Sequence, residues 1–469
     1  MSSPLQSHLS RRHLLKLMGA TLAISACAPV NTPGSQQPAA AGGGAASPAK
    51  AATELVMMYI AGEIPDPLIK QFNDDYKPVH LTRIDVDPTR FYAMFASGEA
   101  PDLVRSMAPD IPQLLGRKML LNLQSYFDAS NVLKADDMLP VNNYYRAGDP
   151  LNIGKGPLYG MVKDWAPDAF IWVNEAVFEK AGVKAPDLTN PVSETDIQTI
   201  ARSLTVREGK QTKIFGYDTA AGFIDRFWMS MAKAAGGSLY TDDFTAIKVV
   251  GNEPVESAIK FYFDLAKDGV MSSPLNPSPA GWFGPDFTGG RLGIVHTGYW
   301  FHGFVISDPG QEFQQAVAAG KVKMYPNFSW HGKRSNPCIT AAGAIITSST
   351  KHPDAAWTAF EWFMGKEPAK DRAKSGWGLP SLSSLANLIP KTGPLSSSTW
   401  TTVQAEEPYS KDTIQFNPYL AGGEPMVPGA VYQTNLEQAL KGEITFNELL
   451  SRIESETNAA IQEGKSQVS

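Results

Sequence analysis

The sequence predicts an α/β fold in which mainly parallel sheets are flanked by helices. The first observation is that short apolar runs alternate with segments of helical spacing at the start of the folded body. The second is that the later part of the chain carries long amphipathic helices. Strands and helices in alternation place the helices on both faces of a mainly parallel sheet. A chain of 469 residues is also too long for one small core, so we expect two or three lobes.

The alternation is clearest in the first part of the folded body. Residues 55–60, 80–86 and 102–105 are short apolar or alternating runs, which we expect to form strands. Residues 66–76 and 91–96 have the apolar spacing of helices. The order is therefore strand, helix, strand, helix, strand, as in a sheet covered by helices.

Three later helices are expected at residues 255–267, 353–364 and 446–461. The first places its apolar residues on one stripe, and the second opens with a proline and an acid. The third is introduced by Thr445, and no internal repeat of fixed period accompanies these helices.

The charge balance is mildly acidic, with 41 basic and 47 acidic side chains and a net charge of -6. Three of the basic groups, Arg11, Arg12 and Lys16, lie in a segment that we expect to be removed, which leaves a mature charge of -9. Nucleic acid is an unfavourable partner for such a surface, because phosphates need basic patches. The two cysteines, Cys27 and Cys338, provide no disulfide framework.

The N-terminal segment is expected to be an export signal, residues 1–26, followed by a lipid anchor. Its adjacent arginines resemble a twin-arginine signal, and the apolar run 17–26 is about half the ~20 residues that span a bilayer. The run ends in Ile-Ser-Ala before Cys27, which resembles a bacterial lipobox. A lipid on Cys27 would hold the protein at the extracytoplasmic face of the cell membrane, facing the periplasm or the cell surface. The alternative is a leader cut elsewhere, with Cys27 incidental.

Residues 27–52 are expected to be a lipidated, disordered tether. They consist mainly of alanine, glycine, proline, serine and glutamine, and such a segment buries too little apolar surface to order itself. No later stretch has 18 consecutive apolar residues, so no other membrane span is expected.

Catalytic signatures are missing, so we expect no enzyme and no metal or other cofactor. The sequence has no metalloprotease, nucleophile-elbow, phosphate-loop or Cys-x-x-Cys motif. Asp85 and Asp87 share one face of an expected strand, where a glycosidase acid and base are conceivable and solvated acids are common. Cys338 is expected to be a small buried residue.

Seven segments, read in order, resemble the extracellular solute-binding proteins of family 1, the class that contains the maltose-binding protein. The first reads Phe-Ala-Ser-Gly-Glu-Ala-Pro-Asp-Leu-Val, and the third contains Phe-Glu-Lys-Ala-Gly. The fourth has the family's glycine pair followed by Gly-Tyr-Trp. Together they cover most of the folded body: residues 95–104, 156–160, 171–183, 287–300, 343–357, 378–380 and 440–450.

This resemblance implies a two-lobed periplasmic-binding-protein fold, similar to type II, with a ligand cleft between the lobes. Lobe 1 would comprise residues 53–172 and 341–380, and lobe 2 residues 173–340 and 381–469. The family pattern is weak over residues 382–424, which are expected to be an insertion beside the cleft. The implied function is a monomeric lipoprotein that captures a sugar or oligosaccharide by hinge closure and delivers it to ABC transporter permease subunits.

The resemblance also implies ligand-binding residues. Carbohydrate sites pair aromatic faces, on which the C–H face of a sugar packs, with polar groups that satisfy the hydroxyls. Trp300 matches the tryptophan of the family's Gly-x-Trp element, which stacks on sugar in several members. Asp110 follows the Pro-Asp loop that points into the cleft in this family, and Asp225 and Trp228 fall in a polar–aromatic segment of the second lobe.

Three further aromatic residues are expected near the ligand from their neighbours in the sequence. Trp165 follows an acid before the first crossing strand, Trp377 is flanked by two glycines, and Tyr432 follows a proline-rich stretch. A core position is the alternative for each aromatic candidate, and ordinary packing or a solvated loop is the alternative for each aspartate.

Other cargo and other functions stay open at this stage. The same fold would serve a polyamine, a glycerol phosphate, a peptide or a metal chelate. Arg105 or Arg226 in the cleft opposite few aromatic rings would favour an anion. An exported carbohydrate-active enzyme would need two cleft carboxylates beside the scissile bond, and a signalling or adhesion lipoprotein would need other partners.

Overall fold

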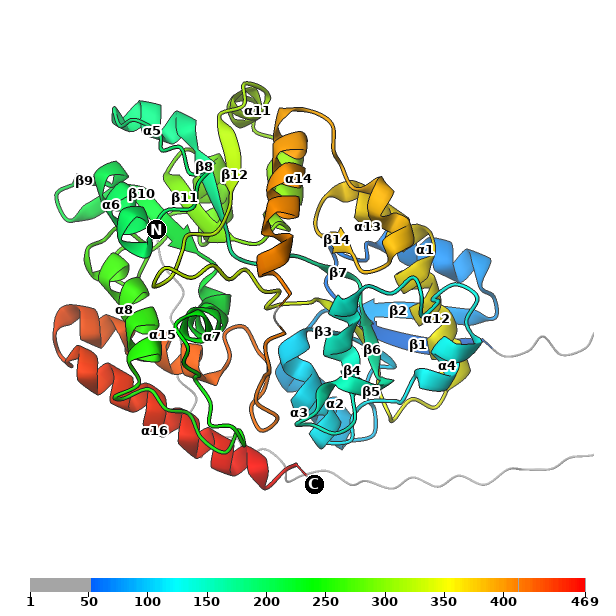
Figure 1. Cartoon of the computed structure of the whole chain (residues 1–469). Helices are drawn as coiled ribbons and strands as arrows, with labels where there is room; N and C mark the ends of the chain where they lie inside the picture. Colours follow the sequence, from blue (N-terminus) through cyan, green and yellow to red (C-terminus); the bar gives the residue numbers. More distant parts are fainter. Residues whose placement is uncertain (1–51, 412, 469) are drawn as a thin grey trace, which may run out of the picture. The chain divides into compact units, whose positions relative to one another are not determined.

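The computed structural model describes residues 52–411 and 413–468, which belong to one compact unit of the chain. The expected signal segment, the lipidated Cys27 and the tether lie outside the described residues. Figure 1 shows the described part as an α/β structure built on two separate sheets, one around the blue and cyan strands and one around the green strands. The α/β fold class is therefore confirmed.

The first sheet has five strands in the order β2-β1-β3-β13-β6. β1 pairs in parallel with β2 and with β3, and α1 (Asp66–Asp75) and α2 (Pro88–Ala96) make the connections between them. The strand β13 lies between β3 and β6 and is antiparallel to both, although it comes much later in the chain. In sheet order the strands are β2 (Val79–Ile84), β1 (Thr53–Met58), β3 (Leu103–Ser106), β13 (Gly343–Ile346) and β6 (Gly160–Val162).

The second sheet has five strands in the order β12-β8-β11-β10-β9. Its single parallel pair is β10 with β11, and its other three pairs are antiparallel. Near its centre lies β8, which arrives directly from the first sheet. In sheet order the strands are β12 (Val322–Tyr325), β8 (Phe170–Asn174), β11 (Leu292–Thr297), β10 (Gln211–Thr219) and β9 (Val206–Glu208).

The strand directions correct one expectation, because the sheets are mixed and not mainly parallel. The parallel pairs are β1 with β2, β1 with β3 and β10 with β11. The physical reason lies in β8 and β13, which each enter their sheet from the other sheet. A strand that arrives in this way needs no helical crossover along its own sheet and is free to run antiparallel to its neighbours.

Helices pack against both sheets and form a further layer of their own (Figure 1). Beside or after strands of the first sheet come α3 (Ile111–Gly116), α4 (Gln124–Ala129), α12 (Pro353–Gly365) and α13 (Glu367–Ser375). Near the second sheet lie α5 (Glu175–Ala181), α6 (Glu194–Leu204), α9 (Phe283–Thr288), α10 (Phe301–Ser307), α11 (Gln311–Ala318) and α14 (Pro394–Glu406). The helical layer consists of α7 (Ile224–Ala234), α8 (Glu253–Lys267), α15 (Val427–Lys441) and α16 (Phe446–Lys465).

Short elements complete the described chain. Two small ladders pair β4 (Arg146–Ala147) with β5 (Ile153–Leu158) and β7 (Asp164–Trp165) with β14 (Leu379–Pro380). The 3-10 helices are η2 (Ala108–Asp110), η3 (Pro140–Tyr145), η4 (Ala221–Phe223), η5 (Ser383–Leu388) and η6 (Glu407–Tyr409).

Local signals in the sequence explain where several helices begin. Asp87 caps α2 by accepting from the backbone N–H of Arg90 at 2.9 Å. Thr445 and Glu448 form a capping box at the start of α16, so three backbone and side-chain donors find partners there. The expected helices at residues 66–76, 353–364 and 446–461 are confirmed with small differences at their ends.

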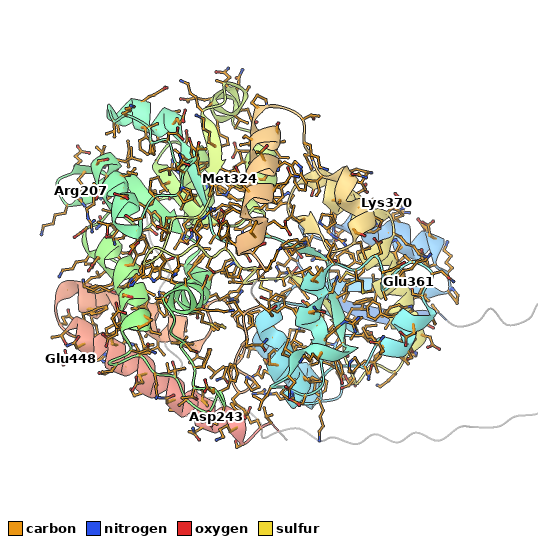
Figure 2. All side chains as sticks on the ribbon, viewed as in Figure 1. Arg207, Asp243, Met324, Glu361, Lys370 and Glu448 are labelled. Carbon is orange, nitrogen blue, oxygen red and sulfur yellow. The ribbon has the colours of Figure 1, made fainter. Side chains whose placement is uncertain are left out.

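Buried apolar side chains form two clusters, the larger of which includes residues of both sheets. Figure 2 shows side chains filling the space around the elements, with Met324 of β12 inside and Arg207 and Asp243 on the outside. Among the described residues, no helix has the length and apolar character that crossing a membrane requires.

Candidate functional site

Charged side chains gather where three strands of the first sheet end. Glu63 follows β1, Arg105 lies in β3, and Lys163 and Asp164 follow β6. Arg105 donates from Nε and Nη2 to the two carboxylate oxygens of Glu63, and both hydrogen bonds are 3.2 Å long. Lys163 forms ion pairs with Glu63 at 3.5 Å and with Asp164. We call these four residues the edge cluster; they hold two cations and two acids at the strand ends where α/β sheets bind ligands.

The charges of the edge cluster stabilise one another. Burial opposes ionisation of the Glu63 carboxyl, but Lys163 and Arg105 outweigh it and hold the pKa of Glu63 below its usual value. Burial likewise opposes the charge of Arg105, and the Glu63 carboxylate outweighs this and raises the pKa of Arg105. The two positive and two negative charges of the cluster therefore cancel. Its charged groups can still form hydrogen bonds with a neutral polar ligand.

Two tryptophans from distant parts of the chain meet beside the edge cluster. Trp300 stands at the start of α10 and Trp377 between α13 and β14, and their rings lie 6.4 Å apart between centroids at an angle of 11°. Trp300 is half-buried and Trp377 is 41 % exposed. A Cβ on Gly378 would lie 2.8 Å from the Cβ of Asp164, so the backbone next to Trp377 lies against the edge cluster.

Trp165 lies at the same junction. It pairs with Leu379 in the ladder of β7 and β14, and its indole Nε1 donates to the carbonyl oxygen of Pro380 at 3.2 Å. The ring is half-buried and packs against the smaller apolar cluster. The structure thus brings Trp165, Trp300 and Trp377 to one region, at the ends of elements that belong to different sheets.

Arg226 of α7 is fully buried and joins three parts of the chain. Its Nη2 donates to the carbonyl oxygens of Gly422 and Gly423 at 3.1 and 2.9 Å, and its Nη1 lies 3.5 Å from the carbonyl oxygen of Ile339. Its guanidinium stands 4.8 Å from the ring centroid of Phe223. Three of its contacts are thus to neutral carbonyl oxygens of this chain.

Asp110 lies at the end of η2, close to the same segment. Its Oδ2 accepts from the backbone N–H of Met107 at 2.7 Å, and a Cβ on Gly422 would lie 2.4 Å from its Oδ1. Burial raises the pKa of the Asp110 carboxyl, against the opposing effect of the Met107 N–H and Arg226. Gly422 therefore lies against Asp110, and it belongs to residues 414–424, which we call the covering segment.

The covering segment contacts both sides of the molecule. Ile414 is buried, and its backbone N–H donates to the Tyr144 hydroxyl at 3.0 Å. A carboxylate oxygen of Glu424 lies 3.9 Å from Nη1 of Arg105 in the edge cluster. The carbonyl oxygens of Gly422 and Gly423 accept hydrogen bonds from Arg226. The segment belongs to the stretch 382–424 that was expected as an insertion, which also contains η5, α14 and η6.

Three residues expected at the ligand are core residues in this structure. Trp228 and Tyr432 pack edge to face with centroids 5.2 Å apart, and Trp228 and Asp225 have no exposed surface. Burial raises the pKa of Asp225 to about 6, and its Oδ2 accepts from the N–H of Gly429 at 3.1 Å. All three belong to the α7–α15 contact, because α7 is buried on every side along most of its length and gives no exposed face. In this structure they take part in the packing of α7 against α15.

Asp168 joins the two chain segments that cross between the sheets, and no pattern in the sequence points to it. Its Oδ2 accepts from the N–H of Ile339 at 2.8 Å and from the N–H and hydroxyl of Thr340 at 3.1 and 2.9 Å. Burial raises the pKa of Asp168 to about 6, against the lowering effect of these donors. We call Asp168, Ile339 and Thr340 the crossing clamp. The other carboxylate oxygen of Asp168, Oδ1, has no hydrogen-bond partner.

The residues considered for catalysis have structural roles. Asp87 caps α2, and Asp85 pairs with Arg83 at 2.8 Å on the surface, so the two acids flank no cleft. Cys338 is buried, and burial raises the pKa of its thiol well above the usual range, which disfavours a nucleophilic thiolate. In the described part of the chain, no group of three or more histidine, cysteine, aspartate or glutamate side chains is placed to hold a metal ion.

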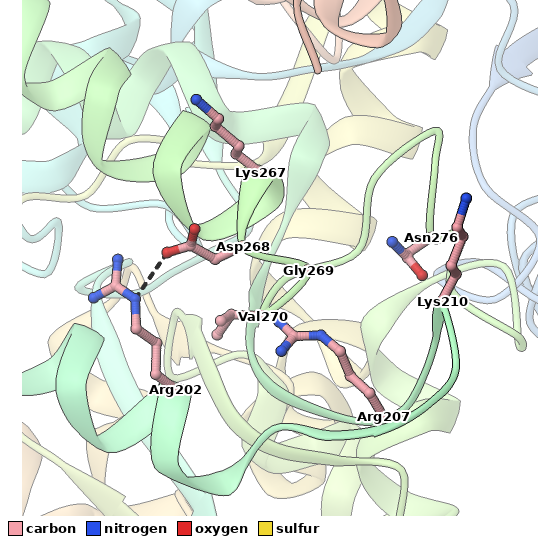
Figure 3. A pocket seen from close by; sticks show the side chains of 8 residues that line it. All are labelled: Arg202, Arg207, Lys210, Lys267, Asp268, Gly269, Val270 and Asn276. Carbon is pink, nitrogen blue, oxygen red and sulfur yellow. Dashed lines mark hydrogen bonds and ion pairs between the residues drawn. The ribbon is translucent and has the colours of Figure 1, made fainter. Parts of the chain in front are cut away.

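A surface hollow of about 500 Å³ lies beside the second sheet, at the ends of α6 and α8 (Figure 3). Among its charged side chains, Asp268 accepts from Arg202 Nε at 2.8 Å, and Lys210 lies beside Asn276 (Figure 3). The lining has no aromatic side chain and shares no residue with the edge cluster, so it does not fit the expected site. It consists of Arg202, Arg207, Lys210, Lys267, Asp268, Gly269, Val270 and Asn276.

Comparison with known proteins supports the fold. A model of the family described as bacterial extracellular solute-binding protein matches residues 60–370. A search of curated protein sequences finds no match. Among solved structures, an ABC substrate-binding protein from Listeria monocytogenes in complex with cycloalternan is similar at a TM-score of 0.69 and 18 % identity, covering 88 % of this chain and 99 % of that one.

Two further solved structures are similar over the same extent. A solute-binding protein from Thermotoga lettingae bound to α-D-tagatose matches at a TM-score of 0.67 and 19 % identity, covering 87 % of this chain and 100 % of that one. A binding protein from B. animalis subsp. lactis in complex with β-1,6-galactobiose matches at 0.66 and 17 % identity, covering 89 % and 98 %. At these identities the likeness establishes the fold of the chain.

Proposed function

Because the chain belongs to the bacterial extracellular solute-binding protein family, we propose that it captures a sugar or oligosaccharide and delivers it to an ABC importer. The observation that carries the proposal is that the backbone next to Trp377, whose ring is stacked with that of Trp300, lies against Asp164 of the edge cluster. Paired charges offer hydroxyl partners, and flat rings offer a surface for the C–H face of a sugar. Three of the similar structures described above hold saccharide ligands, which supports this ligand class.

We place the ligand between the two lobes, which we assign to residues 53–172 with 341–380 and residues 173–340 with 381–469. The edge cluster and Asp110 supply polar groups from the first lobe, and Trp300 supplies a ring from the second. A ligand that touches both lobes only when they approach shifts the hinge equilibrium towards the closed form. The importer then receives the loaded form in preference to the empty one.

The electrostatics favour a neutral ligand over an anion. Arg105 is held by both oxygens of Glu63, and Arg226 donates to backbone carbonyls of the covering segment. The Nε of Arg226 has no hydrogen-bond partner, but the side chain is fully buried. A phosphate or carboxylate ligand would have to displace these partners, whereas a sugar hydroxyl can add to the outer lone pairs of Glu63 and Asp164.

A thermal-shift screen of monosaccharides and oligosaccharides tests the ligand class. A saccharide at 100 times its dissociation constant stabilises the folded state by about 2.7 kcal/mol, which raises the melting temperature measurably. The screen includes polyamines, glycerol phosphate and short peptides as competitors. Stabilisation by one of these, with none by any saccharide, would replace the sugar assignment.

The binding function is distinguished from catalysis by recovery of the ligand. We propose that the protein is not an enzyme, since the acids considered for catalysis cap a helix or pair on the surface. After incubation with a labelled oligosaccharide that binds, chromatography is expected to return the saccharide intact. Shortened products that disappear in an Asp164→Asn variant would instead identify a glycosidase.

We propose in addition that the chain is exported and anchored through its N-terminal segment. Residues 1–26 act as the signal, Cys27 carries the lipid, and the tether up to residue 52 holds the body at the extracytoplasmic face of the membrane. The lipobox-like sequence before Cys27 supports this assignment. Radiolabelled palmitate is expected to label the wild-type protein and not a Cys27→Ala variant, and labelling of both would remove the anchor.

A further inference from the structure

Two tryptophans stand out among the exposed apolar side chains of the described residues. Trp282 is 40 % exposed and Trp377 is 41 % exposed, and the other large apolar residues of comparable exposure are aliphatic. Both rings contact Phe304 of α10, with centroid distances of 4.9 Å for Trp282 and 6.3 Å for Trp377. The two exposed indoles therefore belong to one surface, although 95 positions separate them in the chain.

Each exposed indole is seated on a glycine. A Cβ on Gly284 would lie 2.3 Å from Cη2 of Trp282, and a Cβ on Gly303 would lie 2.5 Å from Cγ of Trp377. A larger residue at either glycine would displace the ring, so the rings lie directly on the backbone of α9 and α10. This fixes one side of each ring against the protein while a large part of its surface stays in solvent.

The surface is continuous with the proposed ligand site. Trp377 lies nearly parallel to Trp300, and Phe304 joins Trp377 to Trp282. We call Trp300, Trp377, Phe304 and Trp282 the aromatic ridge. It begins beside the edge cluster, where Gly378 touches Asp164, and ends at Trp282 before α9.

We infer that the outer part of the aromatic ridge, Phe304 and Trp282 with the open side of Trp377, is a second carbohydrate subsite. It takes the outer sugar units of a chain whose inner units occupy the proposed site, and it therefore rests on the proposed function. Exposed indoles are unfavourable in water unless a ligand covers them. Rigid aromatic faces bind the C–H faces of pyranose rings with little entropic cost, because two χ angles fix each side chain.

The occupant follows from the continuity and from the polarity of the ligand. An oligosaccharide that leaves the edge cluster past Trp300 meets Trp377 next, since these rings are neighbours. A sugar chain needs only one face of each unit covered, so its hydroxyls can stay in water while it lies on the ridge. The ridge thus selects long ligands over short ones without adding charged contacts.

A glycan array containing monosaccharides and oligosaccharides of increasing length identifies the saccharide series that binds. Calorimetry then measures the affinity of each member of that series for the full chain. For the series that binds, the longest member is expected to bind more tightly than the shortest. Trp282→Ala is expected to weaken the longest member roughly tenfold and to leave the shortest unchanged. Trp282→Phe keeps a flat ring and is expected to recover most of the loss, and Gly284→Ala, which displaces the ring, is expected to reproduce it.

Ile306→Ala provides a matched control, because Ile306 is also exposed on α10 but is aliphatic. It is expected to leave the affinity for every saccharide unchanged. Melting temperatures of all variants are measured, and the phenylalanine variant keeps the test valid if Trp282→Ala lowers stability.

Four results would overturn the inference, and they are distinct. Affinities for the longest and shortest members that fall equally in Trp282→Ala would place Trp282 outside an outer subsite. A wild-type dimer in sedimentation that becomes a monomer in both Trp282→Ala and Ile306→Ala would make the ridge a self-association surface. If no glycan binds the wild type at all, the proposed function fails together with this inference, whereas a length series without any effect of Trp282 removes only the inference.

Discussion

The edge cluster and the crossing clamp each contain a carboxyl group withdrawn from water, Glu63 partly and Asp168 fully, but the pKa values of the two groups shift in opposite directions. Glu63 lies against two cations, which hold its pKa below the usual value despite burial. Asp168 accepts only from backbone N–H groups and one hydroxyl at close range, and burial raises its pKa to about 6. Burial alone therefore does not decide the charge of an acid in this protein; the charge of its nearest partners does.

The largest expected contrast is in the pH dependence of stability. The raised pKa of Asp168 makes its ionisation unfavourable in the folded state, so its contribution falls as pH rises from about 4 to 6 and is then constant. Two pKa units correspond to about 3 kcal/mol. Relative to wild type, Asp168→Asn is therefore expected to gain unfolding free energy through this window, as measured by urea denaturation at several pH values.

Glu63 is expected to give the opposite sign in the same experiment. Its lowered pKa contributes stability that is present above about pH 4.5 and is lost as pH falls through the folded value. The cost of Glu63→Gln should therefore be largest at neutral pH and shrink in acid. Parallel pH profiles for the Glu63 and Asp168 variants would contradict the contrast between their partners.

Next in size is the loss of the acceptor in the crossing clamp. Asp168→Ala leaves two backbone N–H groups and one hydroxyl without their partner in a buried place. We expect a loss of about 2 kcal/mol in unfolding free energy at neutral pH, since the removed charge offsets part of the lost bonds. Asp168→Asn keeps an acceptor and is the control, and an equal loss in both variants would show that the charge and not the acceptor matters.

Removal of one cation from the edge cluster is expected to have a smaller effect. Lys163→Met leaves Glu63 with Arg105 as its single cationic contact, and Lys163 is 5 % exposed, so the lost pairing is only weakly screened. We expect a loss of about 1 kcal/mol and a rise in the pKa of Glu63. Lys366→Met serves as the control, because its ion pair with Glu361 spans 4.0 Å and is more exposed. Equal losses in the two variants would argue against a special role of the cluster.

The smallest change in unfolding free energy is expected at Trp300, which is half-buried, in contrast to the fully buried Trp228. Trp300→Ala is expected to weaken saccharide binding about fivefold with little loss of unfolding free energy, because the ring is half-buried. Trp228→Ala, in contrast, removes a fully buried ring and is expected to destabilise by about 3 kcal/mol. Calorimetric affinity and urea denaturation measured together would contradict the assignment if Trp300→Ala left binding unchanged.

The sequence predicted the fold class and most local elements, because these depend on neighbours along the chain. Apolar periodicity and helix caps located α1, α12 and α16 within a few residues. The ordered motifs predicted the solute-binding family, and the family match over residues 60–370 confirms it. The prediction of mainly parallel strands was wrong because β8 and β13 each enter their sheet from the other sheet and run antiparallel to their neighbours. No local pattern in the sequence indicates this.

The candidate site was harder to predict, since it depends on contacts between distant residues. Asp168 and Thr340 are 172 positions apart, and no spacing rule joins them. Trp228 was expected near the ligand. Its helix α7 has an apolar stripe, but Asp225 and Arg226 on its polar side are buried too, so the sequence pattern did not separate core from groove. Trp377 is exposed as expected, although its flanking glycines pack against His302 and Asp164 and are not open.

The position of β13 has a consequence for the order in which the protein is made. This strand joins β3 to β6, yet its residues are synthesised only after the whole second sheet. A nascent chain that ends before residue 343 therefore exposes the facing edges of β3 and β6, two unpaired edges that invite wrong pairing. The first sheet closes late in translation, so chaperone protection of the unfinished chain matters more for this topology than for one whose sheets form in sequence.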